Sequence, residues 1–487
     1  MREGDELVDR HPQKRLHINL DERKLSILVQ SLFSSWMLAL LFEGQVLYSL
    51  AYAYKIAPVV MVFSGIAAHF AGLLFCGFFI KTRKAARKLF LCSFPFCIAI
   101  SVIFFLPPNV FWTVGIIVGS FLAGSCVAAW GYYLKSSTPK SERIKTVADM
   151  LILANILMIL LNTAAIHISP HVGLSLSMLM LLGAFLCALQ LPAGRAADAF
   201  VSSGHKEKPI SITGLLAFLC LFIVVITINS GLMYQVVAPD FAHIEWLTSW
   251  YFALPYIAAL FVMRNLPRRM NRTYILYVAI AMIGLSFIGF MSLGRGVVSY
   301  LAVNTLMLGA FGVYDLFWWS ILGEMLELHK NPAKILGIGL AANVLGVLLG
   351  GLIGNAVTSS NIHSPNPTLL ALFVVCVTLV LLPPLHMRLS SLLTGHAYLT
   401  VFSEMPTREQ TDEVGRAARF KNLSERERQV ASLLLQGKTY RTIADELTIS
   451  ENTVKYYVKN IYSKFGIQSR TELIHIMLKK DDAASTE

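Results

Sequence analysis

Charged residues are scarce in this sequence. Only 14% of its 487 residues are Asp, Glu, Lys or Arg, whereas 55% are hydrophobic, and the mean hydropathy is +0.62. Soluble globular domains carry about 25% charged residues, so most of this chain is not a set of soluble domains. Among the charged residues the acidic ones are fewer: 29 Asp and Glu stand against 41 Lys and Arg, which gives a net charge of +12. Membrane proteins collect Lys and Arg in cytoplasmic loops, so this excess alone does not indicate a nucleic acid partner.

Cysteines and catalytic motifs are also sparse. The seven cysteines all lie in apolar stretches without the spacing of a metal site, which is typical of small buried side chains rather than disulfides. The sequence has no H-E-x-x-H, no Walker-type Gly-x-x-x-x-Gly-Lys and no Ser/His/Asp set with supporting context. Glycine-rich residues 346–354 fit close helix packing instead. We therefore predict no enzyme activity, no metal site and no cofactor.

Long apolar runs fill most of the chain. Each run has about 18–25 residues, which is enough for a helix to cross about 30 Å of hydrocarbon. Short proline-containing turns at 107–109 and 169–171 separate neighbouring runs and suit antiparallel helices. The sequence predicts an all-α fold with about twelve transmembrane helices, at approximately 27–49, 56–80, 89–106, 110–134, 147–168, 172–194, 212–234, 246–263, 274–293, 297–322, 335–357 and 368–387.

Loop charge predicts the orientation in the membrane. Residues 1–26 are polar, form no secretory signal and are predicted to be a cytoplasmic tail. With this end inside, the five inner loops carry 18 Lys and Arg, whereas the outer loops carry only Lys55 and Arg295. This is a strong bias under the positive-inside rule. Twelve crossings return the chain to the same side, so both termini are predicted to be cytoplasmic, with the helices in the cell (inner) membrane.

The longest inner loop, residues 195–211, divides the runs into six and six. Basic clusters recur at matching places, at 81–88 after the second run and at 264–272 after the eighth. In this layout residues 27–387 resemble the major facilitator superfamily, in which two six-helix halves surround a central cavity. The loop at 77–89 reads GFFIKTRKAARKL and departs from that family's pattern because it lacks an Asp. This departure weakens the expectation of transport.

The C-terminal part of the chain has a different pattern. Ser424 and Glu427 form an S-x-x-E capping box, which predicts the start of a helix that Gly437 ends. A shorter helix follows, and Ser450 is the predicted N-cap of a third. A further capping box at 469–472 predicts a fourth. Two helices joined by a tight turn form a helix-turn-helix arrangement.

The third of these helices has an apolar face and a polar face. Its apolar residues recur at helical spacing and are predicted to face inward, at Val454, Val458 and Ile461. The opposite face carries Asn452, Lys455, Tyr456 and Lys459. Amide, ammonium and phenol groups on one exposed face suit a helix that lies in the major groove of DNA. Residues 420–480 hold 11 Lys and Arg against 6 Asp and Glu, a net charge of +5 that favours a DNA partner.

This region resembles the DNA-binding domain of LuxR-type (NarL/FixJ-like) transcription regulators. The resemblance lies in L-S-E-R-E at 423–427, G-K-T-Y-R-T-I-A at 437–444 and S-E-N-T-V-K at 450–455, and covers about an eighth of the chain. It implies binding to double-stranded promoter DNA as a homodimer, often through the fourth helix, with base contacts from the third. We predict that DNA is contacted by Thr439, Thr442, Asn452, Thr453, Lys455, Tyr456, Lys459 and Lys464.

Ionisable groups within transmembrane runs are costly and indicate function. Glu43 lies in the first run and Asp315 in the tenth, where Trp319 shares a face with Asp315 and Asn304 lies three turns earlier. A carboxylate with aromatic walls suits a cationic or polar aromatic ligand, so these four residues are candidate ligand contacts. The alternative is that both carboxyl groups are neutral or bonded to other helices.

Other polar residues in the runs favour structural roles. Asn155 and Asn162 lie two turns apart on one predicted helix and favour hydrogen bonds between helices over ligand contact. His69 is predicted to be a packed core residue, and Arg295 a surface residue on an outer loop.

The regulatory input must lie in the membrane part. Between the apolar runs and the C-terminal domain the sequence has no room for a receiver domain or a soluble ligand-binding domain. We predict a tail at 1–26, a membrane sensor at 27–387, a linker at 388–422, the DNA-binding domain at 423–480 and a second tail at 481–487.

The sequence predicts a membrane-anchored, one-component bacterial transcription regulator, whose membrane domain senses a small molecule and controls DNA binding by the C-terminal domain. One alternative is a major-facilitator-type transporter with an appended DNA-binding domain. Another is a bundle that only anchors that domain to the membrane.

Overall fold

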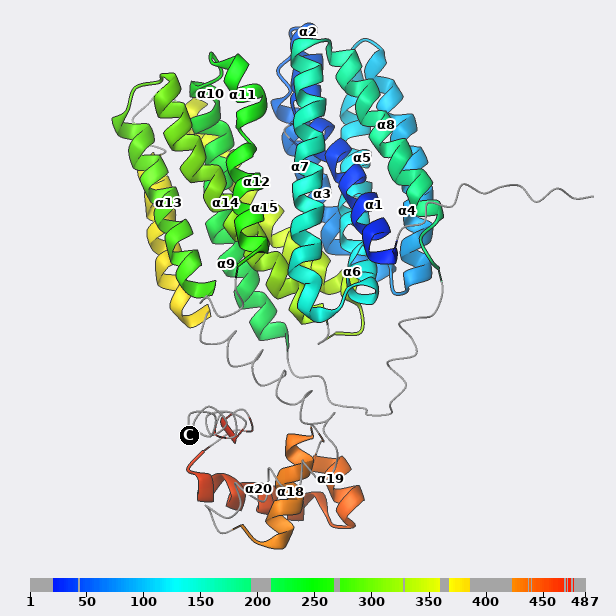
Figure 1. Cartoon of the computed structure of the whole chain (residues 1–487), viewed down its shortest axis with the longest axis vertical. Helices are drawn as coiled ribbons and strands as arrows, with labels where there is room; N and C mark the ends of the chain where they lie inside the picture. The colour runs from blue at the N-terminus through cyan, green and yellow to red at the C-terminus, as the bar shows by residue number, and fades with distance from the viewer. Residues whose placement is uncertain are drawn as a thin grey trace, which may run out of the picture.

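The structure, a computed structural model, is described here for residues 21–42, 44–193, 212–266, 272–326, 329–359, 368–385, 423–436, 438, 440–467, 470, 472–473 and 476. These residues form helices and connecting turns, without a strand among them, which confirms the predicted all-α fold. Twelve spans are long and apolar enough to cross a membrane, as predicted. They stand side by side in one bundle (Figure 1).

Eight α-helices form the first half of this bundle. They are α1 (Glu22–Leu40), α2 (Gln45–Ala53), α3 (Val59–Phe79), α4 (Arg83–Val102), α5 (Val110–Ala129), α6 (Gly131–Ser137), α7 (Arg143–His167) and α8 (Pro170–Leu189). Side-chain oxygens of Thr82, Asn109 and Ser169 accept backbone N–H bonds at the starts of α4, α5 and α8. The predicted turns at 107–109 and 169–171 thus supply the N-cap of the next helix.

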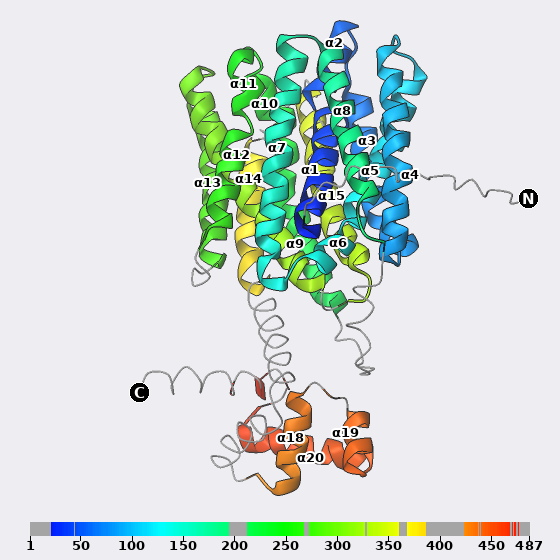
Figure 2. The same ribbon diagram turned by 45° about the vertical axis from the view of Figure 1, so that its right-hand side comes forward.

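The second half continues with α9 (Ile212–Leu232), a π-helical turn (Met233–Val237), α10 (Ala238–Asp240), α11 (Glu245–Tyr251), α12 (Leu254–Arg264), α13 (Arg272–Ser292), α14 (Val297–Met325), α15 (Pro332–Ser359) and a last span at 368–385. Helix α15 joins the halves, since it contacts α3 and α5 as well as α9 of its own half (Figure 2).

Glycines allow the backbones around α15 to approach closely. A Cβ atom at Gly337 would lie 2.4 Å from the carbonyl oxygen of Leu73 in α3. On the other side of α15, a Cβ at Gly350 would lie 2.1 Å from the carbonyl oxygen of Ile228 in α9. Only glycine fits at such distances, so the glycine-rich stretch at 346–354 packs helices together, as expected.

Two predicted spans are each interrupted by a break between two helices, and the span at 110–134 also divides into α5 and α6. Helix α1 begins at Glu22, before the predicted start at residue 27, and ends at Leu40, while α2 begins only at Gln45. Gly44 is the N-cap of α2, and a Cβ there would lie 1.9 Å from the carbonyl oxygen of Ala39. The span at 246–263 is likewise divided into α11 and α12. The pattern of apolar runs did not predict these breaks, although Glu43 and Gly44 interrupt the apolar residues at the first of them.

The C-terminal domain contains α18 (Glu425–Leu435), α19 (Tyr440–Leu447) and α20 (Glu451–Phe465), which pack around their own apolar core. Gly437, the predicted end of the first of these helices, lies outside the described residues. So does most of the predicted fourth helix, including Ser469 of its capping box. Among its described residues, Leu473 is helical and fully buried in the core of the domain.

Candidate DNA-reading helix and membrane cavity

The capping box at the start of α18 is complete. The backbone N–H of Ser424 donates to Glu427 Oε2 at 2.7 Å, and the backbone N–H of Glu427 donates to Ser424 Oγ at 3.3 Å. Both N–H groups would otherwise lack a partner at a helix terminus, so the pair fixes where the helix begins. The predicted capping box is confirmed.

Glu427 also connects α18 to the far end of α20. Its carboxylate is buried and accepts a hydrogen bond from Lys464 Nζ at 2.6 Å. Burial alone would raise the pKa of Glu427, but the bonds from Lys464 and Ser424 outweigh it and hold that pKa below its usual value. Lys464 was predicted to contact DNA; the structure places it in this ion pair, which orients the end of α20 within the domain.

Helix α20 has defined ends. Ser450 Oγ accepts the backbone N–H of Thr453 at 3.1 Å and also contacts Thr453 Oγ1 at 2.8 Å. Ser450 is therefore the N-cap, as predicted. At the other end Gly466 has φ +68, a left-handed conformation that favours glycine. These two signals make α20 a helix of 15 residues with a fixed length.

One face of α20 is buried and the opposite face is exposed over most of its length. The buried residues are Val454, Val458, Ile461 and Phe465. The predicted reading residues are all exposed, namely Asn452, Lys455, Tyr456 and Lys459. The Tyr456 side chain is 61% exposed. Lys455 Nζ lies 3.4 Å from Glu451 Oε1 in an exposed pair, which is weak in water. We call these four side chains the reading face.

Three further residues were predicted to contact DNA. Thr442 is half-buried in α19, and Thr453 is half-buried at the start of α20, where its hydroxyl contacts Ser450. Thr439 lies outside the described residues. The structure thus places Thr453 beside the reading face and gives it a role in capping the helix.

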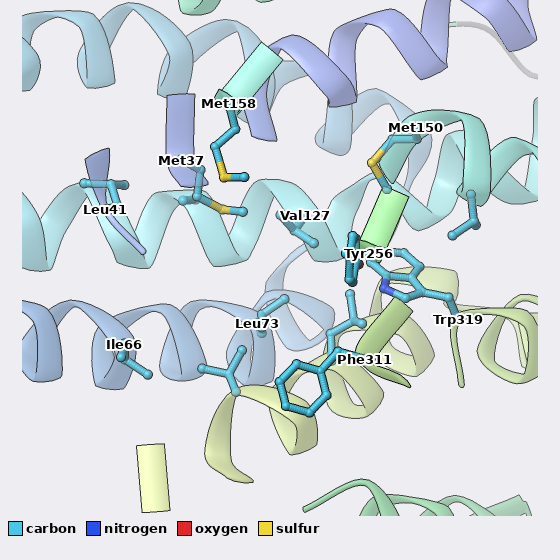
Figure 3. Close-up of a cluster of buried hydrophobic side chains, with 14 of the residues drawn as sticks. Met37, Leu41, Ile66, Leu73, Val127, Met150, Met158, Tyr256, Phe311 and Trp319 are labelled. Atoms are coloured by element: carbon cyan, nitrogen blue, oxygen red, sulfur yellow. The ribbon is translucent and has the colours of Figure 1, made fainter. Parts of the chain in front are cut away.

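A cavity of about 620 Å³ lies between the two halves of the membrane bundle. It is lined by residues of α1, α2, α7, α9, α11, α12, α14 and α15, among others. Figure 3 labels several of the buried side chains that border it: Met37, Met150, Met158, Tyr256, Phe311 and Trp319. Its lining includes Tyr48 and Tyr52 of α2 and Glu245 and Thr248 of α11, so it extends toward the end of the bundle where these helices lie (Figure 1).

Both interrupted spans open onto this cavity. Phe42 and Gly44 line it at the break between α1 and α2, and Phe252 and Ala253 line it at the break between α11 and α12. Irregular backbone inside a membrane is tolerated where it borders a cavity. Glu43, a predicted ligand contact, lies outside the described residues, although both its neighbours line the cavity.

The other three predicted ligand contacts, Asp315, Trp319 and Asn304, all line the cavity. The hydroxyl of Tyr256 donates to Asp315 Oδ2 at 2.5 Å, which joins α12 to α14. The side-chain amide of Asn304 donates to the carbonyl oxygen of Phe252 at 3.3 Å, at the break in the eighth span. The alternative that the carboxyl group of Asp315 bonds to another helix is therefore realised, and the same group also faces the cavity.

Trp319, which lines the cavity, contacts a tryptophan of the first half of the bundle. Its ring contacts that of Trp130 at a centroid distance of 6.0 Å and an angle of 69°. The indole N–H of Trp130 donates to Ser26 Oγ at 2.8 Å, which fixes the ring against α1. The two tryptophans come from different halves, so their contact is one of the points where the halves meet.

Beyond this contact, at the end of the bundle opposite α2 and α11, polar bonds join the halves. Arg264 of α12 donates to both carboxylate oxygens of Asp149 in α7, at 2.5 and 3.2 Å. Arg143 donates to the carbonyl oxygen of Gly323 at 2.8 Å. The side-chain amide of Asn331 donates to the carbonyl oxygen of Gly77 at 2.7 Å. We call these three contacts the inter-half seam.

Sequence reasoning did not single out several of these residues. Tyr256 and Asp149 were not named, although Asp149 is a carboxylate close to the predicted start of a span and thus carried a signal. Asn155, Asn162 and His69 were assigned to packing, yet all three line the cavity. Arg295, predicted to be a surface residue, pairs with Asp240 at 2.9 Å in the described structure.

Comparison with known families concerns the C-terminal domain. The family described as "Bacterial regulatory proteins, luxR family" matches residues 421–477. The chain is 42% identical over 57 residues to the spore germination protein GerE of Bacillus subtilis, of which it covers 77%. It is 33% identical over 89 residues to the transcriptional activator protein ExaE of Pseudomonas putida. Those 89 residues are 18% of this chain and 42% of ExaE, so the similarity spans less than half of that relative.

Comparison with solved structures concerns the membrane bundle. The human organic anion transporter MFSD10 aligns with a TM-score of 0.54 and 13% identity, over 74% of this chain and 98% of the transporter. The major facilitator proton:xylose symporter XylE aligns with a TM-score of 0.56 and 14% identity, over 76% of this chain and 94% of the symporter. At such identity the likeness shows the fold alone, and it confirms the major-facilitator-like layout.

Proposed function

Because its C-terminal domain makes this chain a member of the luxR family of bacterial regulatory proteins, we propose that it is a membrane-anchored, one-component transcription regulator. In this proposal the bundle senses a small molecule and thereby controls sequence-specific DNA binding by the C-terminal domain. The bundle lies in the cell (inner) membrane with both termini in the cytoplasm, where DNA is accessible.

The observation that carries the proposal is the combination of two surfaces in one chain. The exposed reading face of α20 is suited to the major groove, where lysine meets guanine or phosphate and asparagine meets adenine. The cavity between the bundle halves has the size of typical small-molecule sites, which are about 300–1,000 Å³. A protein that only anchored the domain would need no such cavity.

The two helices that hold the Tyr256–Asp315 bond also reach the inter-half seam. Helix α12 carries Tyr256 and, two turns later, Arg264, which bonds to Asp149 of the other half. Helix α14 carries Asp315 and, two turns later, Gly323, which accepts a bond from Arg143. A ligand that shifts either helix therefore changes the seam. To transmit a signal it must bind one state of the bundle more tightly than the other.

We further propose that the domain binds promoter DNA as a homodimer, so that the state of the bundle acts on the spacing of two reading helices. In helix-turn-helix dimers the two half-sites lie about 34–36 Å apart. A change in the separation of two membrane bundles would then favour or disfavour simultaneous binding of both half-sites.

The experiment that tests this function replaces residues 1–390 with an unrelated membrane protein of the same topology and compares the two chains at a responsive promoter. The native chain is expected to regulate the reporter in response to its ligand, and the chimaera is expected to bind DNA without responding. An equal response from the chimaera would contradict sensing by the bundle. A reporter fused after Glu487 that lay outside the cell would contradict the whole proposal.

A second candidate is a transporter with an appended regulatory domain, which the fold and the cavity favour. Uptake of labelled compounds into proteoliposomes containing the full chain distinguishes the two. Ligand-dependent DNA binding without uptake is expected for a sensor, whereas saturable uptake would support the transporter.

A further inference from the structure

We propose that the cavity binds an organic cation, an amine carried on an aromatic or apolar body, with the ammonium group at Asp315. This inference rests on the proposed sensing function and names the class of molecule that is sensed. It follows from the charge of the lining, the position of the carboxyl group and the nature of the surrounding walls.

Apart from the imidazole of His69, the acidic and basic side chains among the described lining residues are carboxyl groups. Asp315 and Glu245 line the cavity, and none of the described residues that line it is Lys or Arg. A carboxylate or phosphate ligand needs a cationic partner when it leaves water, because an isolated buried charge is costly. An anionic ligand would find no Lys or Arg among the described lining residues and would lie near Asp315. The lining therefore disfavours anions and favours cations.

Asp315 is positioned to hold a cation. One carboxyl oxygen, Oδ2, accepts the hydroxyl of Tyr256 at 2.5 Å, which fixes the plane of the carboxyl group. A carboxylate has two oxygens and about four acceptor sites, so this bond leaves Oδ1 for a donor from the cavity. An ammonium group has three donors and no acceptor, which makes it a complementary partner for a carboxylate that already receives a hydroxyl.

The walls around Asp315 suit the body of such a ligand. Tyr314, Trp318 and Trp319 are its neighbours on α14 and line the same cavity, and the rings of Tyr314 and Trp318 stack at 6.1 Å. The faces of aromatic rings attract cations. The cavity is also lined by the flexible, polarizable side chains of Met37, Met150, Met158, Met233 and Met307, which adapt to apolar ligands of irregular shape.

Two other chemistries are less well supported. Among the described residues there is no group of three or more His, Cys, Asp or Glu side chains that could hold a metal ion. A sugar-like ligand, with many hydroxyls, would require several polar partners. The side chains of Asn304, Asn155 and Thr227 already bond to backbone carbonyls, at 3.3, 2.9 and 2.7 Å respectively. The lining atoms that lack a bond, such as Asn162 Oδ1 and the hydroxyl of Tyr314, are uncharged and offer no preference for a sugar over other polar ligands, whereas the carboxyl group of Asp315 favours a cation.

The test compares ligands that share one ring and differ in charge. Tryptamine, tryptophol and indole-3-propionate carry a cationic, a neutral and an anionic group on the same indole, and tetraphenylphosphonium serves as a bulkier cation. Binding to the full chain in lipid nanodiscs is measured by thermal shift, followed by circular dichroism, and by isothermal titration calorimetry, without DNA. We expect at least one cation to bind, and tryptamine to bind at least about tenfold more tightly than indole-3-propionate.

Three variants locate the site. Asp315→Asn is expected to weaken cation binding by about tenfold or more, since it removes a charge-assisted hydrogen bond. Tyr256→Phe keeps the carboxyl group and is expected to retain the preference for cations. Asp240→Asn is the matched control, because Asp240 pairs with Arg295 and does not line the cavity. It should bind cations as the native chain does.

The proposal is overturned if no cation binds at millimolar concentration, if the propionate or tryptophol binds as tightly as tryptamine, or if Asp315→Asn binds cations normally. A folded Tyr256→Phe protein without cation preference would also overturn it. Failure of the sensing function is a separate result: cations would bind in nanodiscs, and DNA binding by the same preparation would not change.

Discussion

The two parts of this chain use polar side chains in opposite ways. The C-terminal domain buries its apolar residues and exposes Lys455, Tyr456 and Lys459 to solvent, where we propose that they contact DNA. The membrane bundle exposes apolar residues at its outer surface, such as Val60 and Phe79, and turns Asp315 and Asn304 toward a central cavity. A polar residue therefore marks the outside of one part and the inside of the other, because water surrounds the first and lipid the second.

This difference explains the unequal similarity of the two parts to known proteins. In the proposed role, the face of α20 must fit the major groove, which restricts the residue types it can carry, and the C-terminal domain is 42% identical to GerE over 57 residues. The bundle must only be apolar outside and packed inside, which many sequences satisfy. Its identity to major facilitator structures is accordingly 13–14% although the fold is shared.

The largest effect is expected from removing charge at the reading face. Lys455→Ala together with Lys459→Ala should weaken binding to DNA by about 1–3 kcal/mol for each lysine that contacts a base. If a lysine contacts only phosphate, its loss should reduce the slope of log binding constant against log salt concentration by about one unit. Binding of the full chain in nanodiscs to DNA fragments selected from the genome measures this.

Arg428→Ala is the control for this pair, because Arg428 pairs with Glu425 on α18 and is not part of the reading face. It should bind DNA nearly as well as the native chain. Unchanged binding by the double variant would show that a different surface meets the DNA.

The next effect concerns two carboxyl groups in the membrane bundle. Glu43→Gln and Asp315→Asn are each expected to shift the ligand concentration for half-maximal reporter response by about tenfold, because a charge-assisted bond contributes about 1.5–3 kcal/mol. Membrane insertion, followed by fractionation and protease protection, should be unaffected. Native dose responses in both variants would assign these residues to structure alone.

A smaller effect is expected at the inter-half seam. Arg264→Gln removes the bond to Asp149. The two side chains are 30% and 32% exposed, so their bond is partly screened by solvent and its loss should shift the equilibrium between bundle states by about 1 kcal/mol or less. This shift corresponds to a change of up to a few-fold in basal reporter output. Exchanging the charges, with Asp149→Arg and Arg264→Asp together, should restore native output. If the exchange behaved like the single variant, the pair would not control the state.

An effect of similar size is expected on the stability of the C-terminal domain. Because folding lowers the pKa of Glu427, its contribution is full above the pKa of the unfolded chain and is lost as pH falls through the lower, folded pKa. Glu427→Gln keeps the capping box but not the charge, and should cost about 1 kcal/mol near neutral pH. Denaturation of the domain at pH 7 and in the acid range, where native and variant should converge, measures this.

The sequence was sufficient for features that depend on local chemistry. The capping box at Ser424, the N-cap at Ser450 and the buried face of α20 follow from residue type and spacing. The number of spans follows from hydropathy. The breaks near Gly44 and Phe252 did not follow, because tertiary contacts produce them. Nor did the pairing of Tyr256 with Asp315, since a tyrosine in an apolar run gives no sign of which helix it will meet.

The contact between Trp130 and Trp319 has a practical consequence. The two indoles belong to opposite halves and touch edge to face, so each ring lies in the magnetic and electronic field of the other. Any rocking of the halves changes that overlap, and fluorine labels on the tryptophans would report it as a change in chemical shift. Movement of the two halves relative to each other could thus be measured in a membrane from the chemical shifts of these two tryptophans, without attaching a dye.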